Sequence, residues 1–281
     1  IRQLATTREE IDTAIHQERK NTRKELQGKI DSQKLEEVLD ELRERLGGKL
    51  AIHAELSKEK ELLDSMYVAF EDRFRGSRED IKERMKVYLP LIDAVKNVSG
   101  SATVLDLGCG RGEWLELMKE QGYPAKGVDL NTIMVRMCKE RDLDAAEYDA
   151  IEYLRQQRPD SIGAITGFHL VEHLPFRTLI ALCDECLRVL KPGGMLIFET
   201  PNPENLMVGA FSFYFDPSHR NPLPPGTLQF FVEQRGFTNT TVKKLHKYSD
   251  FVEIHDSDEF KNKWFYSDMD YSVIAYKHAN I

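Results

Sequence analysis

The sequence predicts an α/β protein with a doubly wound sheet, preceded by a charged helical segment, and three observations predict it. Apolar runs of strand length alternate with helical patterns from residue 104 onward, as in βαβ units. The first run, Val104–Leu107, breaks into glycines at alternate positions, Gly108, Gly110 and Gly112, and a helical pattern follows. The last two apolar runs have no helical pattern between them, which predicts an antiparallel edge of the sheet.

Length and charge restrict the class of protein. The chain has 281 residues, enough for one large domain with an appendage, and a net charge of −8, which argues against non-specific nucleic-acid binding. No apolar run has the length of a transmembrane helix or of a secretory signal. Cys183 and Cys186 lie mid-helix without a second ligand pair, so we expect reduced thiols in a cytoplasmic protein.

Residues 1–66 differ from the rest of the chain. They are rich in Glu, Lys, Arg and Gln, and their apolar residues recur at steps of three and four along a narrow seam. Such a thin seam buries little area alone, so we expect a coiled coil that self-associates or binds partner proteins. The alternative is a solvated helix packed on its own domain. The globular domain is then residues 67–281.

The local signals place the elements of this domain. Ser77 with Asp80 predicts a helix N-cap before residues 78–88, and Pro90 predicts a break. Residues 191–194 read as a turn, and residues 201–225, with several prolines, as a lid insertion. Strands are predicted at 104–107, 125–128, 144–147, 162–166, 195–199, 240–246 and 271–276, and helices at 113–121, 131–140, 150–157, 176–189 and 225–235.

The glycine turn predicts a nucleotide-type site. Alternate glycines let backbone N–H groups approach a ligand at a helix N-terminus, and Asp129, at the end of the next strand, suits ribose hydroxyls. The dinucleotide fingerprint fits less well, because Glu113 stands where its last glycine falls. A pyrophosphate would also meet the carboxylates of Asp106 and Glu113. A cofactor that carries a sulfonium and an ammonium group suits this acidic turn better.

The turn resembles the first motif, D-x-G-x-G-x-G, of the class I S-adenosylmethionine-dependent methyltransferases, with matches at Asp106, Gly108, Gly110 and Gly112. Residues 187–194 resemble the helix-to-strand passage of the same superfamily. The resemblance implies a seven-stranded sheet with an antiparallel C-terminal hairpin, and S-adenosyl-L-methionine as cofactor. The cofactor-binding residues that it implies are Arg75, Asp106, Gly108, Gly110, Asp129, Leu130, Asp149, Ala150 and Phe168.

The resemblance implies a specific role for two of these residues. Arg75 corresponds to a pre-strand arginine that binds the cofactor carboxylate, for which a guanidinium is well shaped. Asp149 corresponds to an acid near the adenine, although it suits the N-cap of the next helix equally well. Phe168 and His169 follow the fourth strand, where ligands lie in open α/β sheets.

The lid insertion 201–225 mixes aromatic and amide side chains, which predicts sugar binding because sugar faces stack and hydroxyls need paired donors and acceptors. A purely structural lid is the alternative. The chain resembles bacterial methyltransferases of surface-polysaccharide assembly, including O-antigen enzymes, that carry coiled coils. This resemblance implies a glycan or lipid-linked glycan acceptor and attachment to the inner membrane only through partners. The expected substrate-binding residues are His173, Asn202, Tyr214, Asp216 and Asn221.

Transfer of a methyl group to a sugar hydroxyl benefits from a general base. His219 is the first candidate because imidazole titrates near neutral pH, and His169 is the second, with Asp216 or Glu199 orienting either. No carboxylate cluster suggests a metal, so we expect metal independence. Two other functions stay open: a small-molecule or quinone-type methyltransferase, and a non-catalytic scaffold with a vestigial fold.

Overall fold

The computed structural model describes residues 55–100, 103–247 and 259–279, together with residues 13, 16–18 and 20. The chain separates into two compact units, Ile1–Lys60 and Glu61–Ile281. The coiled coil predicted for residues 1–66 therefore lies largely outside the described residues. The second unit opens with residues 61–74, which are helical and are called the 61–74 helix below.

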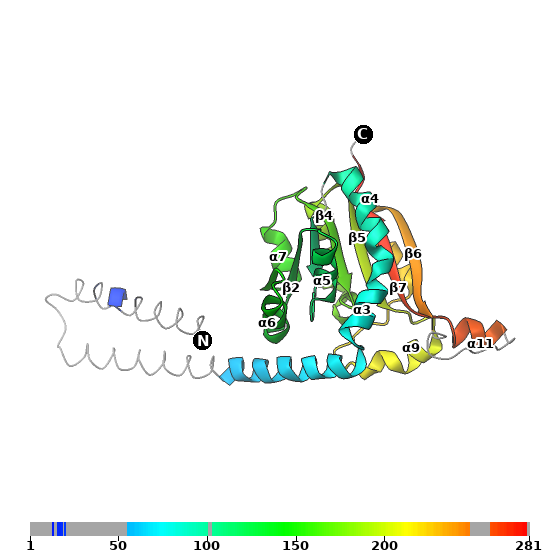
Figure 1. The fold of residues 1–281 in the computed structure, drawn as a ribbon, viewed down its shortest axis with the longest axis horizontal. Helices are drawn as coiled ribbons and strands as arrows, with labels where there is room; N and C mark the ends of the chain where they lie inside the picture. The colour runs from blue at the N-terminus through cyan, green and yellow to red at the C-terminus, as the bar shows by residue number, and fades with distance from the viewer. Residues whose placement is uncertain are drawn as a thin grey trace. The chain divides into compact units, whose positions relative to one another are not determined.

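The second unit contains the seven-stranded mixed sheet that the sequence predicts (Figure 1). The strand order is β3-β2-β1-β4-β5-β7-β6, in which β7 runs antiparallel to both β5 and β6 and the remaining pairs are parallel. The predicted antiparallel edge is thus confirmed. The strands are β1 Val104–Leu107, β2 Ala125–Asp129, β3 Ala145–Glu147, β4 Ile162–Phe168, β5 Leu190–Pro201, β6 Thr238–Lys247 and β7 Asp268–Tyr276.

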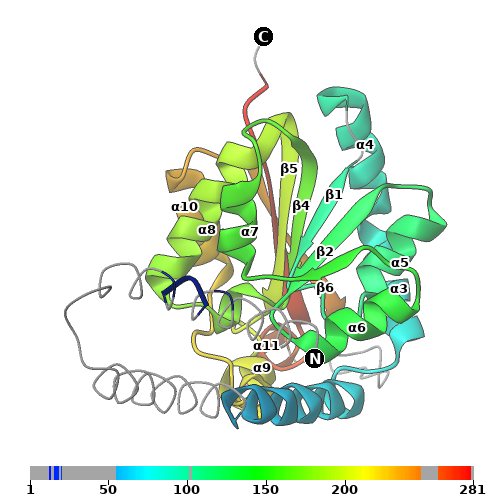
Figure 2. The same cartoon turned by 90° about the vertical axis from the view of Figure 1, so that its left-hand side faces the viewer.

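Helices cover both faces of the sheet, as the doubly wound fold requires. In Figure 2, α4, α5 and α6 lie on one side and α7, α8 and α10 on the other. The helices are α3 Arg78–Met85, α4 Leu89–Ser99, α5 Glu113–Glu120, α6 Thr132–Glu140, α7 Ala150–Gln156, α8 Phe176–Val189, α9 Leu206–Ala210, α10 Pro225–Gln234 and α11 Glu259–Trp264. Short 3₁₀ turns are η1 Lys86–Tyr88, η2 Val171–His173 and η3 Ser212–Phe215.

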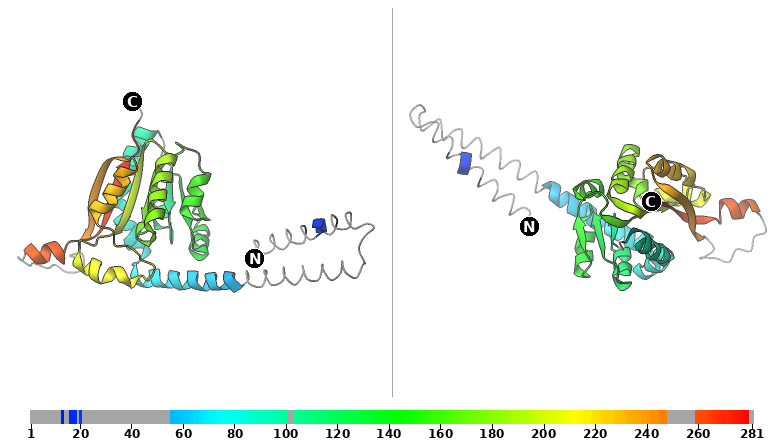
Figure 3. Two further views of the ribbon diagram at one scale, coloured as in Figure 1. Left: turned by 180° about the vertical axis from the view of Figure 1, so that it is seen from behind. Right: turned by 90° about the horizontal axis from the view of Figure 1, so that it is seen from above.

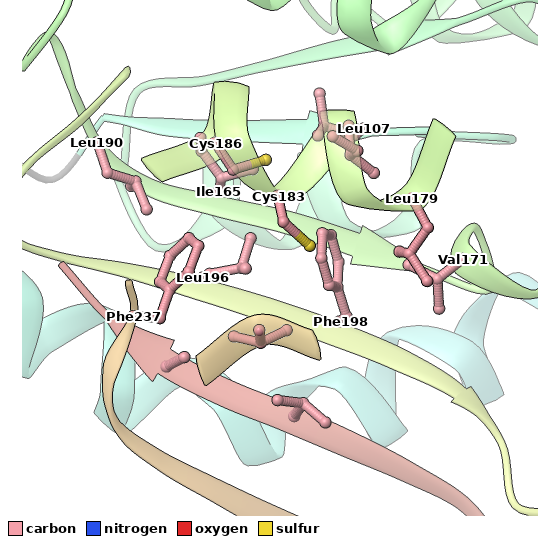
Figure 4. Close-up of a cluster of buried hydrophobic side chains, with 14 of the residues drawn as sticks. Leu107, Ile165, Val171, Leu179, Cys183, Cys186, Leu190, Leu196, Phe198 and Phe237 are labelled. Carbon is pink, nitrogen blue, oxygen red and sulfur yellow. The ribbon is translucent and has the colours of Figure 1, made fainter. Parts of the chain in front are cut away.

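Each face of the sheet has its own apolar core. On one face, Leu196 and Phe198 of β5 pack with Leu179, Cys183 and Cys186 of α8 (Figure 4). On the other face, side chains from α3, α4 and α5 cover β1 and β5. The Cys183 and Cys186 thiols are free, as the sequence predicts, and both are fully buried in this core.

Local chemistry explains most helix boundaries. The N–H of Asp80 donates to Ser77 Oγ at 3.2 Å, which confirms the predicted N-cap of α3. The break predicted at Pro90 lies where η1 ends and α4 begins, and Pro90 occupies the first turn of α4. A missing N–H costs nothing at that position.

Three features differ from the predicted elements. Residues 191–194 do not form a turn outside the strand. They belong to β5, where the register shifts between Ile162 and Ala164 of its neighbour and Gly193 has φ +75°. The insertion contains α9 and η3, and α11 lies between β6 and β7. These helices have four to six residues, too few to produce a detectable periodicity.

Candidate active site

The glycine turn follows β1 and leads into α5. Gly108, Gly110 and Gly112 have φ of +66°, +51° and +83°, conformations that L side chains rarely adopt. A Cβ on Gly110 would lie 3.6 Å from Arg75 Nη1 and 3.8 Å from Glu71 Oε2. The side chains of Arg75 and Glu71 therefore lie directly over the turn at Gly110, and Figures 1 and 3 show the 61–74 helix at the same end of the sheet as α9.

Asp129 is held beside this turn. Its carboxylate accepts hydrogen bonds from the backbone N–H groups of Gly110 at 2.8 Å and Asn131 at 2.7 Å. The next residue, Leu130, is exposed. Asp149 accepts hydrogen bonds from the N–H groups of Ile151 and Glu152, which confirms it as the N-cap of α7, whose first residue is Ala150.

Asp106 lies beneath the turn. It is buried and accepts a hydrogen bond from Thr166 Oγ1 at 2.7 Å. Burial raises the pKa of its carboxyl to about 7, although the Thr166 hydroxyl and the Arg75 guanidinium oppose the shift. A cation placed over the turn would therefore favour the ionised form of Asp106.

Arg111 ties the turn to the 61–74 helix. Its guanidinium donates to Asp72 Oδ1 at 2.9 Å and to the carbonyl of Gly76 at 3.2 Å, and its side chain is almost fully buried. Arg75 directly follows the same helix, and its side chain forms an ion pair with Glu71 at 3.1 Å. These contacts fix the predicted Arg75 above the glycine turn.

A cavity of about 250 Å³ brings five of the predicted site residues together: Arg75, His169, His173, Asp216 and His219. Aromatic rings of Tyr67, Phe70, Phe74 and Phe215 form part of its wall. Glu199, His246 and Asp270 also line it. The cavity thus combines aromatic walls with a group of imidazoles and carboxylates.

His219 and His169 have opposite electrostatic environments. Burial lowers the pKa of His219 despite the nearby Glu172 carboxylate. Its Nδ1 lies 2.6 Å from the carbonyl of Phe213, an arrangement that assigns the proton of the neutral ring to Nδ1 and leaves Nε2 as the acceptor. Burial alone would lower the pKa of His169, but Glu172, Glu199 and Asp270 raise it to about 10.

Glu172 connects the lid to both imidazoles. It is fully buried, and its carbonyl accepts hydrogen bonds from the N–H groups of Arg220 and Asn221 in the lid. Its Oε2 accepts from Thr200, whereas Oε1 lies 3.3 Å from His169 Nδ1 and 3.8 Å from His219 Nε2. His169 itself has φ +52°, a strained conformation of the kind found at functional sites.

The other predicted site residues do not line the cavity: the cofactor-binding residues other than Arg75, and three of the substrate-binding residues, Asn202, Tyr214 and Asn221. The Phe168 ring is buried in the core between Tyr88 and Trp114. Asn202 is fully buried and donates to the carbonyl of Asp268 in β7, and Asn221 donates to the carbonyl of Leu174. Tyr214 is exposed on η3. In the described structure, Asn202 and Asn221 therefore hold the lid insertion in place.

Two sets of side chains have the geometry to hold a metal ion. The ligand atoms within each set lie within 4.8 Å of one another, and the sets are Glu172, His173 and His219, and His169, Glu199 and Asp270. Sequence reasoning did not find these sets, because their members come from segments up to about a hundred residues apart. Glu71, Tyr67, His246 and Asp270 were missed for the same reason.

Comparisons with known proteins show the family to which the fold belongs. A family model described as a methyltransferase domain matches residues 34–242. The ubiquinone biosynthesis O-methyltransferases of Paraburkholderia xenovorans (strain LB400) and Idiomarina loihiensis are 32% and 36% identical over 127 and 104 residues. These matches cover 43% and 35% of this chain and 53% and 42% of the relatives, so the chain spans about half the length of the curated relatives it matches.

A solved structure is similar over a larger share of the chain. The crystal structure of a SAM-dependent methyltransferase from Archaeoglobus fulgidus has a TM-score of 0.67 and 34% sequence identity, and the match covers 75% of this chain and 99% of that one. The curated relatives are named for ubiquinone biosynthesis and not for polysaccharide assembly. No helix among the described residues is long and apolar enough to cross a membrane. The chain belongs to the SAM-dependent methyltransferase family.

Proposed function

We propose that the protein transfers the methyl group of S-adenosyl-L-methionine to a hydroxyl of a sugar, in a bacterial surface polysaccharide or its lipid-linked precursor. One observation carries the proposal. A neutral imidazole, that of His219, lies in a cavity that also reaches Arg75 above the glycine turn. Methyl transfer to a weakly acidic hydroxyl needs a base beside the donor, and Arg75 connects the cavity of His219 to the glycine turn.

The residues around the turn fit the donor. The acidic group of Asp129 and the buried carboxyl of Asp106 suit a ligand with ribose hydroxyls and positive charge. When bound, the donor supplies an electrophilic methyl carbon, and the electron pair of the broken carbon–sulfur bond goes to sulfur. Arg75 would bind its carboxylate, and the exposed Leu130 and the first turn of α7 at Ala150 would border its adenine.

The acceptor hydroxyl loses its proton to His219. Its oxygen forms the new bond to the methyl carbon while Nε2 of His219 takes the proton, so the products are a methyl ether and an imidazolium. The ionised Glu172, whose Oε1 lies 3.8 Å from Nε2, stabilises that imidazolium. His169 is already protonated near neutral pH, so its role is to supply positive charge and not to accept the proton.

The lining of the cavity supports a sugar acceptor. Rings of Phe70, Phe74 and Phe215 offer faces for stacking, while His173 and Asp216 offer acceptors for neighbouring hydroxyls. Asp216 is oriented by Tyr67, whose hydroxyl donates to it at 2.8 Å. A phenolic hydroxyl of a quinone-type acceptor is the second candidate, favoured by the names of the curated relatives.

The test uses the full chain with methyl-labelled S-adenosyl-L-methionine and two panels of acceptors, purified bacterial glycans and catechol-type phenols. We expect label in the glycan and a methyl ether in the product, and label confined to the phenols would favour the second candidate. Binding of S-adenosylhomocysteine, measured by calorimetry, distinguishes a methyltransferase with either acceptor from a non-catalytic scaffold. A protein that does not bind it is a scaffold.

We also propose that the reaction needs no added metal. Protonated His169 already places a positive charge beside the two carboxylates of the second set, because its Nε2 lies 3.7 Å from Glu199 and 3.8 Å from Asp270. Turnover should therefore stay within twofold of its starting value after dialysis against EDTA. A loss of turnover that zinc or manganese restores would show that one of the two sets holds a metal.

A further inference from the structure

The Glu71 carboxylate has an unusual position above the glycine turn. Glu71 lies one helical turn before Arg75, so both side chains lie on the same face of the 61–74 helix and both line the cavity. Arg75 Nη1 and Glu71 Oε2 are the atoms that a Cβ on Gly110 would meet first. A negative and a positive group therefore lie side by side, directly above the cofactor turn.

One oxygen of Glu71 is unsatisfied. The residue is only 8% exposed, and its Oε1 accepts a hydrogen bond from Arg75 Nη1 at 3.1 Å. Its Oε2 accepts no hydrogen bond from the described residues, although Arg111 Nε lies 3.8 Å away. A buried carboxylate oxygen without a donor is costly, so this geometry indicates that, when the site is filled, a cationic donor reaches Glu71 from the cavity that Glu71 lines.

We infer that Glu71 and Arg75 form a paired binding site for the amino-acid end of the methyl donor, in which Glu71 Oε2 accepts a hydrogen bond from the α-ammonium group. Arg75 binds the α-carboxylate, which is its role in the proposed function, and the inference rests on that placement of the donor. The two charged groups of the ligand then meet the two opposite charges of the helix.

Contacts on either side support this assignment. Below the turn, the buried Asp106 already accepts a hydrogen bond from Thr166. An ammonium group over the turn has three N–H donors, and a donor on the side away from Asp106 points toward Glu71. Arg111 joins the turn to Asp72 and Gly76, which fixes the spacing between the turn and Glu71 before the ligand binds. The helix that carries Glu71 thereby becomes part of the cofactor site.

The test compares ligands that differ at the amino-acid end. Calorimetry measures the affinity of the full chain and of Glu71→Gln for three ligands: S-adenosylhomocysteine, its deamino analogue with hydrogen in place of the ammonium, and 5′-methylthioadenosine, which lacks the whole amino-acid end. We expect Glu71→Gln to weaken S-adenosylhomocysteine by about tenfold or more, the size of a lost charge-assisted hydrogen bond. Its affinities for the other two ligands should change less than twofold.

A matched variant and thermal unfolding serve as controls. Glu61→Gln makes the same substitution on the same helix outside the cavity, and it should leave all three affinities unchanged. Equal weakening of all three ligands by Glu71→Gln, or unchanged affinity for S-adenosylhomocysteine, would overturn the inference. If the unaltered protein binds none of the ligands, the placement of the donor fails, and the inference fails with it.

Discussion

His219 and His169 contact the same buried carboxylate, that of Glu172, yet their surroundings favour different charge states. His219 has a lowered pKa, whereas the pKa of His169 is raised to about 10. A base must be neutral to act, so kcat/KM should fall as the pH drops through the pKa of His219, which lies below the ordinary value of 6.5.

The pH profile also separates the two histidines. His219→Ala should lower kcat by a factor of about 10²–10⁴ while still binding S-adenosylhomocysteine. It should also abolish the fall of kcat/KM at low pH, which is the acid limb of the profile. His169→Gln should slow turnover but keep the limb, because its own titration lies far above neutral pH. An unchanged acid limb in His219→Ala would remove it as the base.

Asp106 couples cofactor binding to pH. Its carboxyl, with a pKa raised to about 7 by burial, is partly neutral in the free protein. The ammonium group of a bound ligand favours the carboxylate, so binding below pH 7 must release a proton. The affinity for S-adenosylhomocysteine should therefore rise between pH 5.5 and 7.5, by no more than about tenfold per pH unit.

Calorimetry across this pH range measures the effect, and Asp106→Asn is the comparison. The variant should bind more weakly, and most of the pH dependence should disappear because the amide does not titrate. Affinity that stays constant with pH in the unaltered protein would show that the ligand does not sense Asp106.

At the scale of elements, the junction between β1 and α5 depends on Gly112. This residue is the N-cap of α5 with φ +83°, and a Cβ there would lie 2.6 Å from Cys138 Sγ and 3.0 Å from Leu143 Cδ1. Gly112→Ala adds a steric clash with α6 to the strain of the backbone. We expect it to lower the free energy of unfolding by roughly 2–4 kcal/mol.

Gly76 provides the matched comparison, since it has φ +107° but no atom within 4 Å of its Cβ position. Gly76→Ala should show backbone strain alone, about 1–2 kcal/mol, in urea unfolding followed by circular dichroism. Equal losses in the two variants would mean that the contact with Cys138 relaxes at no cost.

Local signals explain why most elements could be predicted from the sequence. The Ser77 and Asp149 caps, the glycine turn and the apolar runs act over a few residues, so β1 and α8 have the predicted bounds and other elements differ by a few residues. The short helices in the lid and before β7 form through tertiary contacts, such as the hydrogen bond from Asn205 to the carbonyl of Ser267.

At the scale of the whole molecule, the site depends on contacts that no local pattern contains. His169 and His219 could be predicted to lie near the site because His169 follows a recognisable strand and His219 lies within the recognisable insertion 201–225. Glu71 and Asp270 could not, because only the fold brings the 61–74 helix and β7 to the cavity. Phe168 shows the reverse case: it stands at the predicted strand end, but its ring enters the core.

The chain divides into two compact units, and the site belongs to the second. All three apolar clusters and every residue of the cavity lie between Tyr67 and Tyr276, within the unit Glu61–Ile281. A chain that begins at Glu61 should therefore fold by itself and bind S-adenosylhomocysteine within twofold of the full chain. We propose that residues 1–66 serve self-association or partner binding, so the shorter chain should be monomeric while the full chain associates. Sedimentation velocity at matched concentrations measures the association, and calorimetry measures the binding. A shorter chain that fails to unfold cooperatively would show that the first unit stabilises the second, and equal association of both chains would locate the contact outside the N-terminal segment.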